Sequence, residues 1–140
     1  MSLVINVDKV LKNDRELSKA IEDLLIARKD RAKALVGKTT ITSYRRIHEI
    51  LGSVLDKIES QLRTGRQINI IDLSKVLVLI SYQEARGQIS KVLANYLKDM
   101  VRTVLHEVGR SETAELRGIV SRARTLIDAF TVLVYEYGKK

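Results

Sequence analysis

Along most of this chain, hydrophobic residues recur every three or four positions, which is the period of an amphipathic α-helix. The clearest stripe consists of Tyr44, Ile47, Leu51, Val54, Ile58 and Leu62. Thr42 or Ser43 can accept hydrogen bonds from free N–H groups at the helix start, and Gly65 can end the helix. The pattern therefore predicts a helix from Thr42 or Ser43 to just before Gly65.

A second helix is predicted near the N-terminus. Asn13 is followed three residues later by Glu16, a spacing that resembles a capping box. Gly37 stands where a left-handed helix stop is expected. We therefore predict one helix over residues 14–36, and its buried face would consist of Leu17, Ile21, Leu24, Ala32 and Leu35. Residues 3–7 are too few to assign and could form an extended arm or a first helical turn.

The C-terminal half predicts three more helices. Gly87 followed by Ser90 offers a stop and a new N-cap, which divides a long apolar stretch into helices 72–86 and 90–108. Asp72 or Ser74 would cap the first of these, and Gly109 would stop the second. Ser111 would then cap a last helix that ends before Gly138 and buries Leu116, Ile119, Ala123, Ile127, Phe130 and Val134.

Composition supports this helical interpretation. The chain has 140 residues, no proline and seven glycines, so little in it interrupts a helix. That length suits one domain with its own core. We expect an all-α fold, a compact bundle of about five helices, in a single domain over residues 1–140.

The same composition argues against several classes of function. Without cysteine there is no disulfide framework, thiolate nucleophile or Cys-ligated zinc, and a reducing cytoplasm is the expected location. The longest apolar run, residues 76–80, is too short to cross a bilayer, and no targeting segment stands at the N-terminus. His48 and His106 each precede a glutamate but lack the second histidine of an HExxH zinc helix, and no phosphate-binding glycine loop is present. We therefore predict no metal, no cofactor, no membrane association and no enzymatic activity.

Charge is the remaining signal. The chain carries a net charge of +8 with a pI of about 9.8, which favours anionic partners. Arg45 and Arg46 fall in the first turn of their predicted helix, where the helix dipole disfavours cations. Arg45 could pair with Glu49 one turn on while Arg46 points to solvent, or both could help to bind a phosphate.

Three further arginines are candidates for such contacts. Arg86 lies at a predicted helix end, where capping alone could explain it. Arg117 and Arg124 are seven residues apart on one face of the last helix, and ion pairs such as Arg124 with Asp128 are the alternative explanation there. A single phenylalanine argues against an aromatic base-stacking platform.

Three blocks of sequence, taken in order, resemble one family. They are Thr42-Ser43-Tyr44-Arg45-Arg46, Tyr82-Gln83-Glu84-Ala85-Arg86, and the segment from Phe130 to Tyr137 that ends Leu-Val-Tyr-Glu-Tyr. Together they resemble the small subunit of type III-A CRISPR effector complexes, the Csm small subunit, over about residues 38–140. Residues 1–37 would then be a lineage-specific N-terminal helix.

The resemblance implies a non-catalytic, cytoplasmic helical subunit of an antiviral crRNA-guided complex. Such a subunit packs against other Csm-type effector subunits and touches the backbone of the single-stranded target RNA. By position, Arg46 and Arg86 match the family's arginines, whereas Arg45, Arg117 and Arg124 are added from charge and spacing. Self-association, as a dimer for example, is a further expectation.

Two alternatives remain open. Val132-Leu133 replaces the small residue usual in the last block and Gly87 follows the second arginine, which leaves room for the small subunit of the type III-B (Cmr) complex. The other alternative is a helical protein-interaction module without nucleic acid, in which the arginines serve a protein interface or surface ion pairs.

Overall fold

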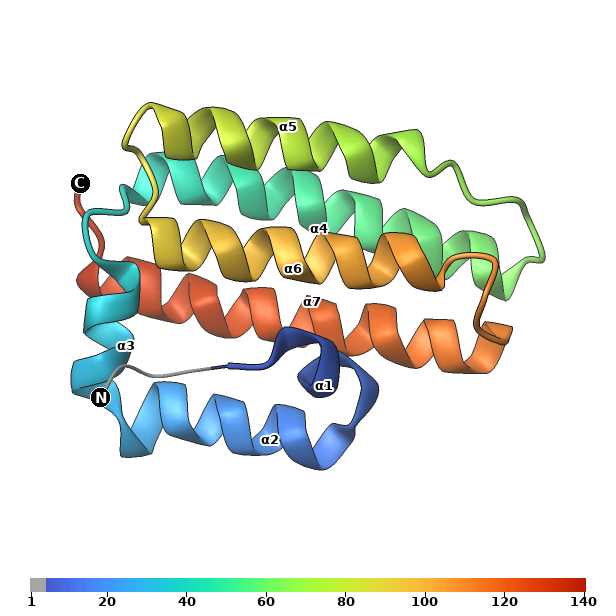
Figure 1. Ribbon diagram of the computed structural model, residues 1–140, viewed down its shortest axis with the longest axis horizontal. Coiled ribbons are helices and arrows are strands. Elements are labelled where there is room, and N and C mark those ends of the chain that lie inside the picture. The colour runs from blue at the N-terminus through green and yellow to red at the C-terminus, as the bar shows by residue number, and fades with distance from the viewer. Residues whose placement is uncertain (1–4) are drawn as a thin grey trace.

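The computed structural model describes residues 5–140, and over this range the chain is all-helical, as expected (Figure 1). The number of helices differs from the prediction of about five, because the described residues form seven α-helices and one π-helical turn. They are α1 (Val7–Lys12), α2 (Asp14–Glu22), the π-helical turn η1 (Asp23–Ala27), α3 (Lys29–Val36), α4 (Ile41–Arg63), α5 (Ile71–Ala85), α6 (Lys91–Glu107) and α7 (Thr113–Tyr137).

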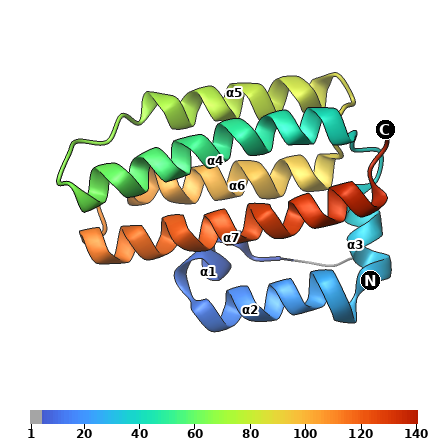
Figure 2. The same cartoon turned by 180° about the vertical axis from the view of Figure 1, so that it is seen from behind.

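The four long helices α4 to α7 form an antiparallel bundle. Each packs against the next in the chain, and α7 returns to pack against α4, so the four enclose a common core. The short connections keep successive helices side by side and opposite in direction. As a result, the start of α4, the end of α5, the start of α6 and the end of α7 all lie at one end of the bundle (Figures 1 and 2).

Residues 5–36 cover one side of this bundle. Helix α1 packs on α6 and α7, while α2 and α3 pack on α7. Leu11, Leu24 and Val36 are fully buried and belong to the same hydrophobic cluster as the core of the four long helices. The tyrosine ring of Tyr96 on α6 stacks on Phe130 with centroids 6.3 Å apart, and its hydroxyl accepts a hydrogen bond from the backbone N–H of Ile5.

The predicted continuous helix over residues 14–36 is wrong in its middle. It breaks at Arg28, whose φ of −136° and ψ of 49° are not helical. In an unbroken helix, Arg28 and Arg31 would fall on the same face as Leu17 and Leu24. Burying two unpaired guanidinium groups would be costly, and the break turns α3 so that Ala32 and Leu35 reach the core instead.

Two of the predicted caps are confirmed. The side chain of Asn13 accepts hydrogen bonds from the N–H groups of Arg15 and Glu16, and Ser90 accepts one from the N–H of Leu93. Gly87 follows the C-cap of α5 with a φ of 73°, the left-handed conformation expected of a residue that stops a helix.

Three other caps were assigned to the wrong residue. Helix α4 begins at Ile41 with Thr40 as its cap, so neither Thr42 nor Ser43 has that role. The N–H of Ile71 bonds to the Asn69 side chain, while Asp72 pairs with Lys57. Ser111 donates to the carboxylate of Glu107 and does not cap α7.

Candidate nucleic-acid interface

Four helix ends are tied together at one end of the bundle by the segments that flank them. The backbone N–H of Thr40 donates to the carbonyl of Gln88, and the N–H of Ser90 donates to the hydroxyl of Thr39, each at 2.9 Å. The C-terminal segment closes the same end, because the N–H of Ile41 donates to the carbonyl of Lys139 at 2.8 Å. The three sequence blocks that carry the family resemblance therefore meet in space (Figure 2).

The hydroxyl groups of this region serve the fold. Thr39 is fully buried, and Thr40 caps α4 through the N–H of Ser43. The hydroxyls of Thr40 and Ser43 both contact the side-chain oxygen of Gln88, at 3.4 and 3.5 Å. The start of α4 is thus largely occupied by internal hydrogen bonds, so a phosphate bound here would depend on side-chain cations more than on free N–H groups.

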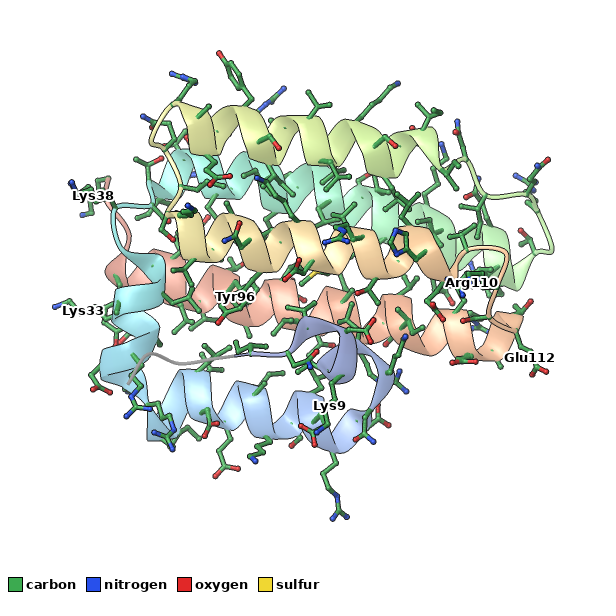
Figure 3. The ribbon with its side chains drawn as sticks, viewed as in Figure 1. Lys9, Lys33, Lys38, Tyr96, Arg110 and Glu112 are labelled. Atoms are coloured by element: carbon green, nitrogen blue, oxygen red, sulfur yellow. The ribbon has the colours of Figure 1, made fainter. Side chains whose placement is uncertain are left out.

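Six exposed cations surround these helix ends, and we call them the basic end. None of them belongs to an ion pair formed between residues 5 and 140. Lys38 projects outward beside the C-terminus (Figure 3). Glu84, which shares this end, is already neutralised by Lys98 at 2.6 Å. The basic end consists of Lys38, Arg45, Arg46, Arg86, Lys91 and Lys139.

Arg46 and Arg86 lie at nearly the same level of the bundle. On α4, Lys57 pairs with Asp72 of α5 at 3.1 Å, which shows how the two antiparallel helices are aligned. Arg46 lies about three turns before Lys57 and so shares its face of α4. Because α5 runs in the opposite direction, the residue at the same level as Arg46 lies about three turns after Asp72, at Gln83. Arg86 is less than one turn beyond Gln83, so both guanidinium groups lie at the same end of the α4–α5 pair.

Arg86 is held in place by an aromatic ring. Its guanidinium carbon lies 5.3 Å from the ring centroid of Tyr82, within the range of a cation–π interaction. Tyr82 is 56% exposed, so this pair stands on the surface. The planar guanidinium keeps its N–H donors for a phosphate while the ring restricts its rotamers.

Arg45 points to the other side of α4. It precedes His48 by about one turn, and the Nε2 of His48 lies 2.8 Å from the carboxylate of Asp128 on α7. Arg45 is therefore on the α7 side, near the level of Val132, which is 51% exposed. The ion pair with Glu49 that offered another explanation for Arg45 does not form in the structure.

Arg117 and Arg124 lie elsewhere, in the seam between α4 and α7. Arg117 pairs with Glu59 at 2.9 Å and Arg124 with Asp56 at 3.7 Å. The expected pair of Arg124 with Asp128 is wrong, because Asp128 contacts His48. The guanidinium of Arg124 also occupies the space beside Gly52, where an added Cβ would collide with its Nη1 atom.

The five candidate arginines thus form two groups with different surroundings. Arg45, Arg46 and Arg86 are exposed at the basic end, while Arg117 and Arg124 join two helices through carboxylates. Lys38, Lys91 and Lys139 were missed in the sequence, although each directly follows a helix-ending glycine or an N-cap. In an antiparallel bundle such positions converge at one end, which is the signal that could have identified them.

The described part of the chain was also searched for a metal site and for a membrane-spanning helix. No three His, Asp or Glu side chains between residues 5 and 140 are grouped so that they could hold a metal ion. No helix in that range is long and apolar enough to cross a membrane. Comparisons of the chain with protein-family models, with curated proteins and with solved structures found no match.

Proposed function

We propose that this protein is a non-catalytic RNA-binding subunit and that its basic end binds the phosphate backbone of single-stranded target RNA. The observation that carries this proposal is the convergence of the three family-like blocks at one bundle end, together with six cations that form no ion pair among residues 5–140. Unpaired surface arginines and lysines release counterions when they bind phosphates, which is the main source of affinity in sequence-independent binding.

The larger assembly follows from the resemblance. On this proposal the chain is the small subunit of a cytoplasmic type III-A CRISPR effector in antiviral defence, it packs against other Csm-type subunits, and cleavage belongs to a neighbouring subunit. The small subunit of a type III-B (Cmr) complex would share the fold and the RNA backbone contact. An adjacent set of Csm or Cmr genes would decide between the two.

The direct test measures binding of single-stranded RNA over a salt series, with the isolated protein and within the reconstituted complex. Replacement of both Arg46 and Arg86 by alanine should reduce the slope of log K against log salt by about 1 to 2, because about two phosphate contacts are lost. An unchanged affinity and slope would overturn the assignment.

A matched control is available at the opposite end of the bundle, in the last residue of α4 and the loop that follows it. Arg63 and Arg66 are exposed and form no ion pair between residues 5 and 140. Replacing both by alanine removes the same charge, so it should leave the RNA affinity much closer to that of the original protein. Equal losses for the two pairs would indicate that only net charge matters and that the basic end is not a site.

A second candidate, a helical protein-interaction module, is favoured by one observation. Helix α5 exposes large apolar side chains, with Val78 at 69%, Tyr82 at 56% and Ile71 at 55%. A surface of this kind is typical of a protein contact. It is compatible with RNA binding at the basic end, since a subunit of an effector complex needs both.

A further inference from the structure

Helix α3 carries exposed lysines across the same end of the molecule as the basic end. Lys29 and Lys33 are about one turn apart on α3, and Lys38 follows the glycine that ends the helix. None of the three forms an ion pair between residues 5 and 140. Lys33 and Lys38 both project outward from one edge of the molecule (Figure 3). We call Lys29, Lys33 and Lys38 the α3 row.

The break at Arg28 places this row where it is. Helix α2 runs along the flank of the bundle, whereas α3 lies across the end of the bundle, at a steep angle to the long helices (Figures 1 and 2). A straight helix that continued from α2 would instead carry the lysines past the end of the bundle. The break therefore brings them beside the helix ends that form the basic end.

Helix α3 is fixed to the start of α6. The hydroxyl of Ser90 donates to the carbonyl of Leu35 at 2.7 Å, and the side chains of Leu35 and Val36 are buried in the core. Ser90 is also the N-cap of α6, and the next residue, Lys91, belongs to the basic end. The α3 row and the basic end are therefore parts of one surface with a fixed geometry.

We propose that the α3 row continues the RNA-binding site, so that a single strand bound at the basic end runs on over α3. This inference rests on the proposed function and adds phosphate contacts outside residues 38–140, the part of the chain that resembles the family. Lys29 and Lys33 are separated by about 6 Å along the helix axis, which is close to the distance between neighbouring phosphates of an extended strand. Each further contact to the same strand adds affinity, because the strand is already held nearby.

The composition of this segment favours the backbone of a polyanion. Residues 29–38 contain four cations and one carboxylate, that of Asp30. The fourth cation, Arg31, lines a separate hollow between α1, α2 and the start of α3. Residues 29–38 include no aromatic side chain on which a base could stack. The α3 row is therefore expected to contact phosphates of any RNA sequence.

The test uses an oligouridylate of about 12 nucleotides over a series of salt concentrations. Lys29→Ala combined with Lys33→Ala should lower the affinity at least about threefold and reduce the slope of log K against log salt by about 1.4, at roughly 0.7 per phosphate contact of a single strand. Both side chains are exposed, so the midpoint of urea unfolding should not change.

Helix α2 provides a matched control. Arg15 and Lys19 are exposed, have the same spacing of four residues, and form no ion pair within residues 5–140. Replacing both by alanine removes the same charge from the flank of the bundle, and the slope should stay near its original value.

RNA length and one opposite charge change sharpen the test. A strand of about four nucleotides has fewer phosphates than the basic end has cations, so the Lys29 and Lys33 variant should change its affinity less than about twofold. Asp30→Asn removes the carboxylate beside the row and should raise the affinity for the longer strand by about 1.5-fold to twofold. Equal losses for the two RNA lengths would mean that the lysines act through net charge alone, which would overturn the inference.

The inference would also be overturned by unchanged binding of the longer RNA in the Lys29 and Lys33 variant, or by an equal loss in the α2 control. Failure of the proposed function is a different result, namely unchanged binding after Arg46→Ala combined with Arg86→Ala. If only the α3 variant lost affinity, both the basic end as a site and the continuous path over α3 would be wrong.

Discussion

The basic end and the α4–α7 seam both contain arginines, but their charges are used differently. In the seam, Arg117 and Arg124 are paired with Glu59 and Asp56, so each charge is balanced within the fold. At the basic end, Arg46 and Arg86 form no ion pair within residues 5–140, and the guanidinium of Arg86 lies over an aromatic ring. Net charge alone does not separate the two groups, whereas pairing does, because only an unpaired cation is free to bind a phosphate and displace the counterions condensed on the RNA.

Charge reversal at the basic end is the strongest test of this difference between the two regions. Arg46→Glu combined with Arg86→Glu should lower the affinity for single-stranded RNA at least about tenfold, or about 1.4 kcal/mol, with little change in the free energy of unfolding. Filter binding or fluorescence anisotropy at low salt would measure the loss.

Variants in the α4–α7 seam supply the control, because they should affect stability and not RNA binding. Arg117→Ala combined with Arg124→Ala should leave the salt slope of RNA binding near its original value and lower the free energy of unfolding by about 0.5 to 2 kcal/mol, because two partly exposed ion pairs are lost. If the seam variant lost as much RNA affinity as the end variant, the division of the arginines into two groups would be wrong.

Tyr44 makes the stability of the α4–α7 contact depend on pH. Its hydroxyl is buried at the α4–α7 contact near the basic end and donates to the carbonyl of Ile127 at 2.7 Å. Burial raises the pKa of Tyr44 well above the ordinary value of 10.0. The unfolded chain therefore ionises this phenol first, so its contribution is complete below pH 10 and is lost as the pH rises beyond it.

Above that pH, the loss from this one group should be about 1.4 kcal/mol per pH unit. Tyr44→Phe should reduce the alkaline loss of stability and cost about 0.5 to 1.5 kcal/mol at neutral pH. The cost should be near the lower value, because Thr131 also donates to the carbonyl of Ile127. Urea unfolding at a series of pH values would measure both effects, and parallel curves for the two proteins would contradict the role of Tyr44.

Much of the helical content could be predicted from the sequence, because periodic burial depends on spacing alone. All six positions expected on the buried face of the last helix are buried in α7. The break at Arg28 was missed because apolar residues continue through it, and only the phase of the charged residues indicates that a straight helix would bury them.

The candidate site was predictable only in part. Arg46 and Arg86 could be selected from a motif, but their common level in the bundle depends on the alignment of α4 with α5, which the contact between Lys57 and Asp72 reveals. Arg117 and Arg124 looked equally suitable in the sequence, because Glu59 and Asp56 are distant along the chain and become partners only when α7 returns to α4. Local spacing finds charges, and tertiary pairing decides which of them remain unpaired.

The smallest effect we predict tests whether Arg124 belongs to the fold. Gly52→Ala should stabilise a helix interior by about 1 kcal/mol. With Arg124 present, however, the new methyl group would displace its guanidinium, so the net gain should be about half as large. In the Arg124→Ala background the full gain should return, which gives a coupling of about 0.5 kcal/mol in a double-mutant cycle measured by urea unfolding.

The same cycle built with Arg117→Ala is the matched control for Gly52→Ala, because Arg117 pairs with Glu59, about two turns farther along α4. It should show no coupling. If Gly52→Ala gave the same gain in all three backgrounds, Arg124 would not be held against α4 in solution, and it would be as free to bind RNA as Arg46. Zero coupling between Gly52 and Arg124 would therefore place Arg124 among the cations available to RNA. Arg117 would then be the one candidate arginine still assigned to the α4–α7 seam.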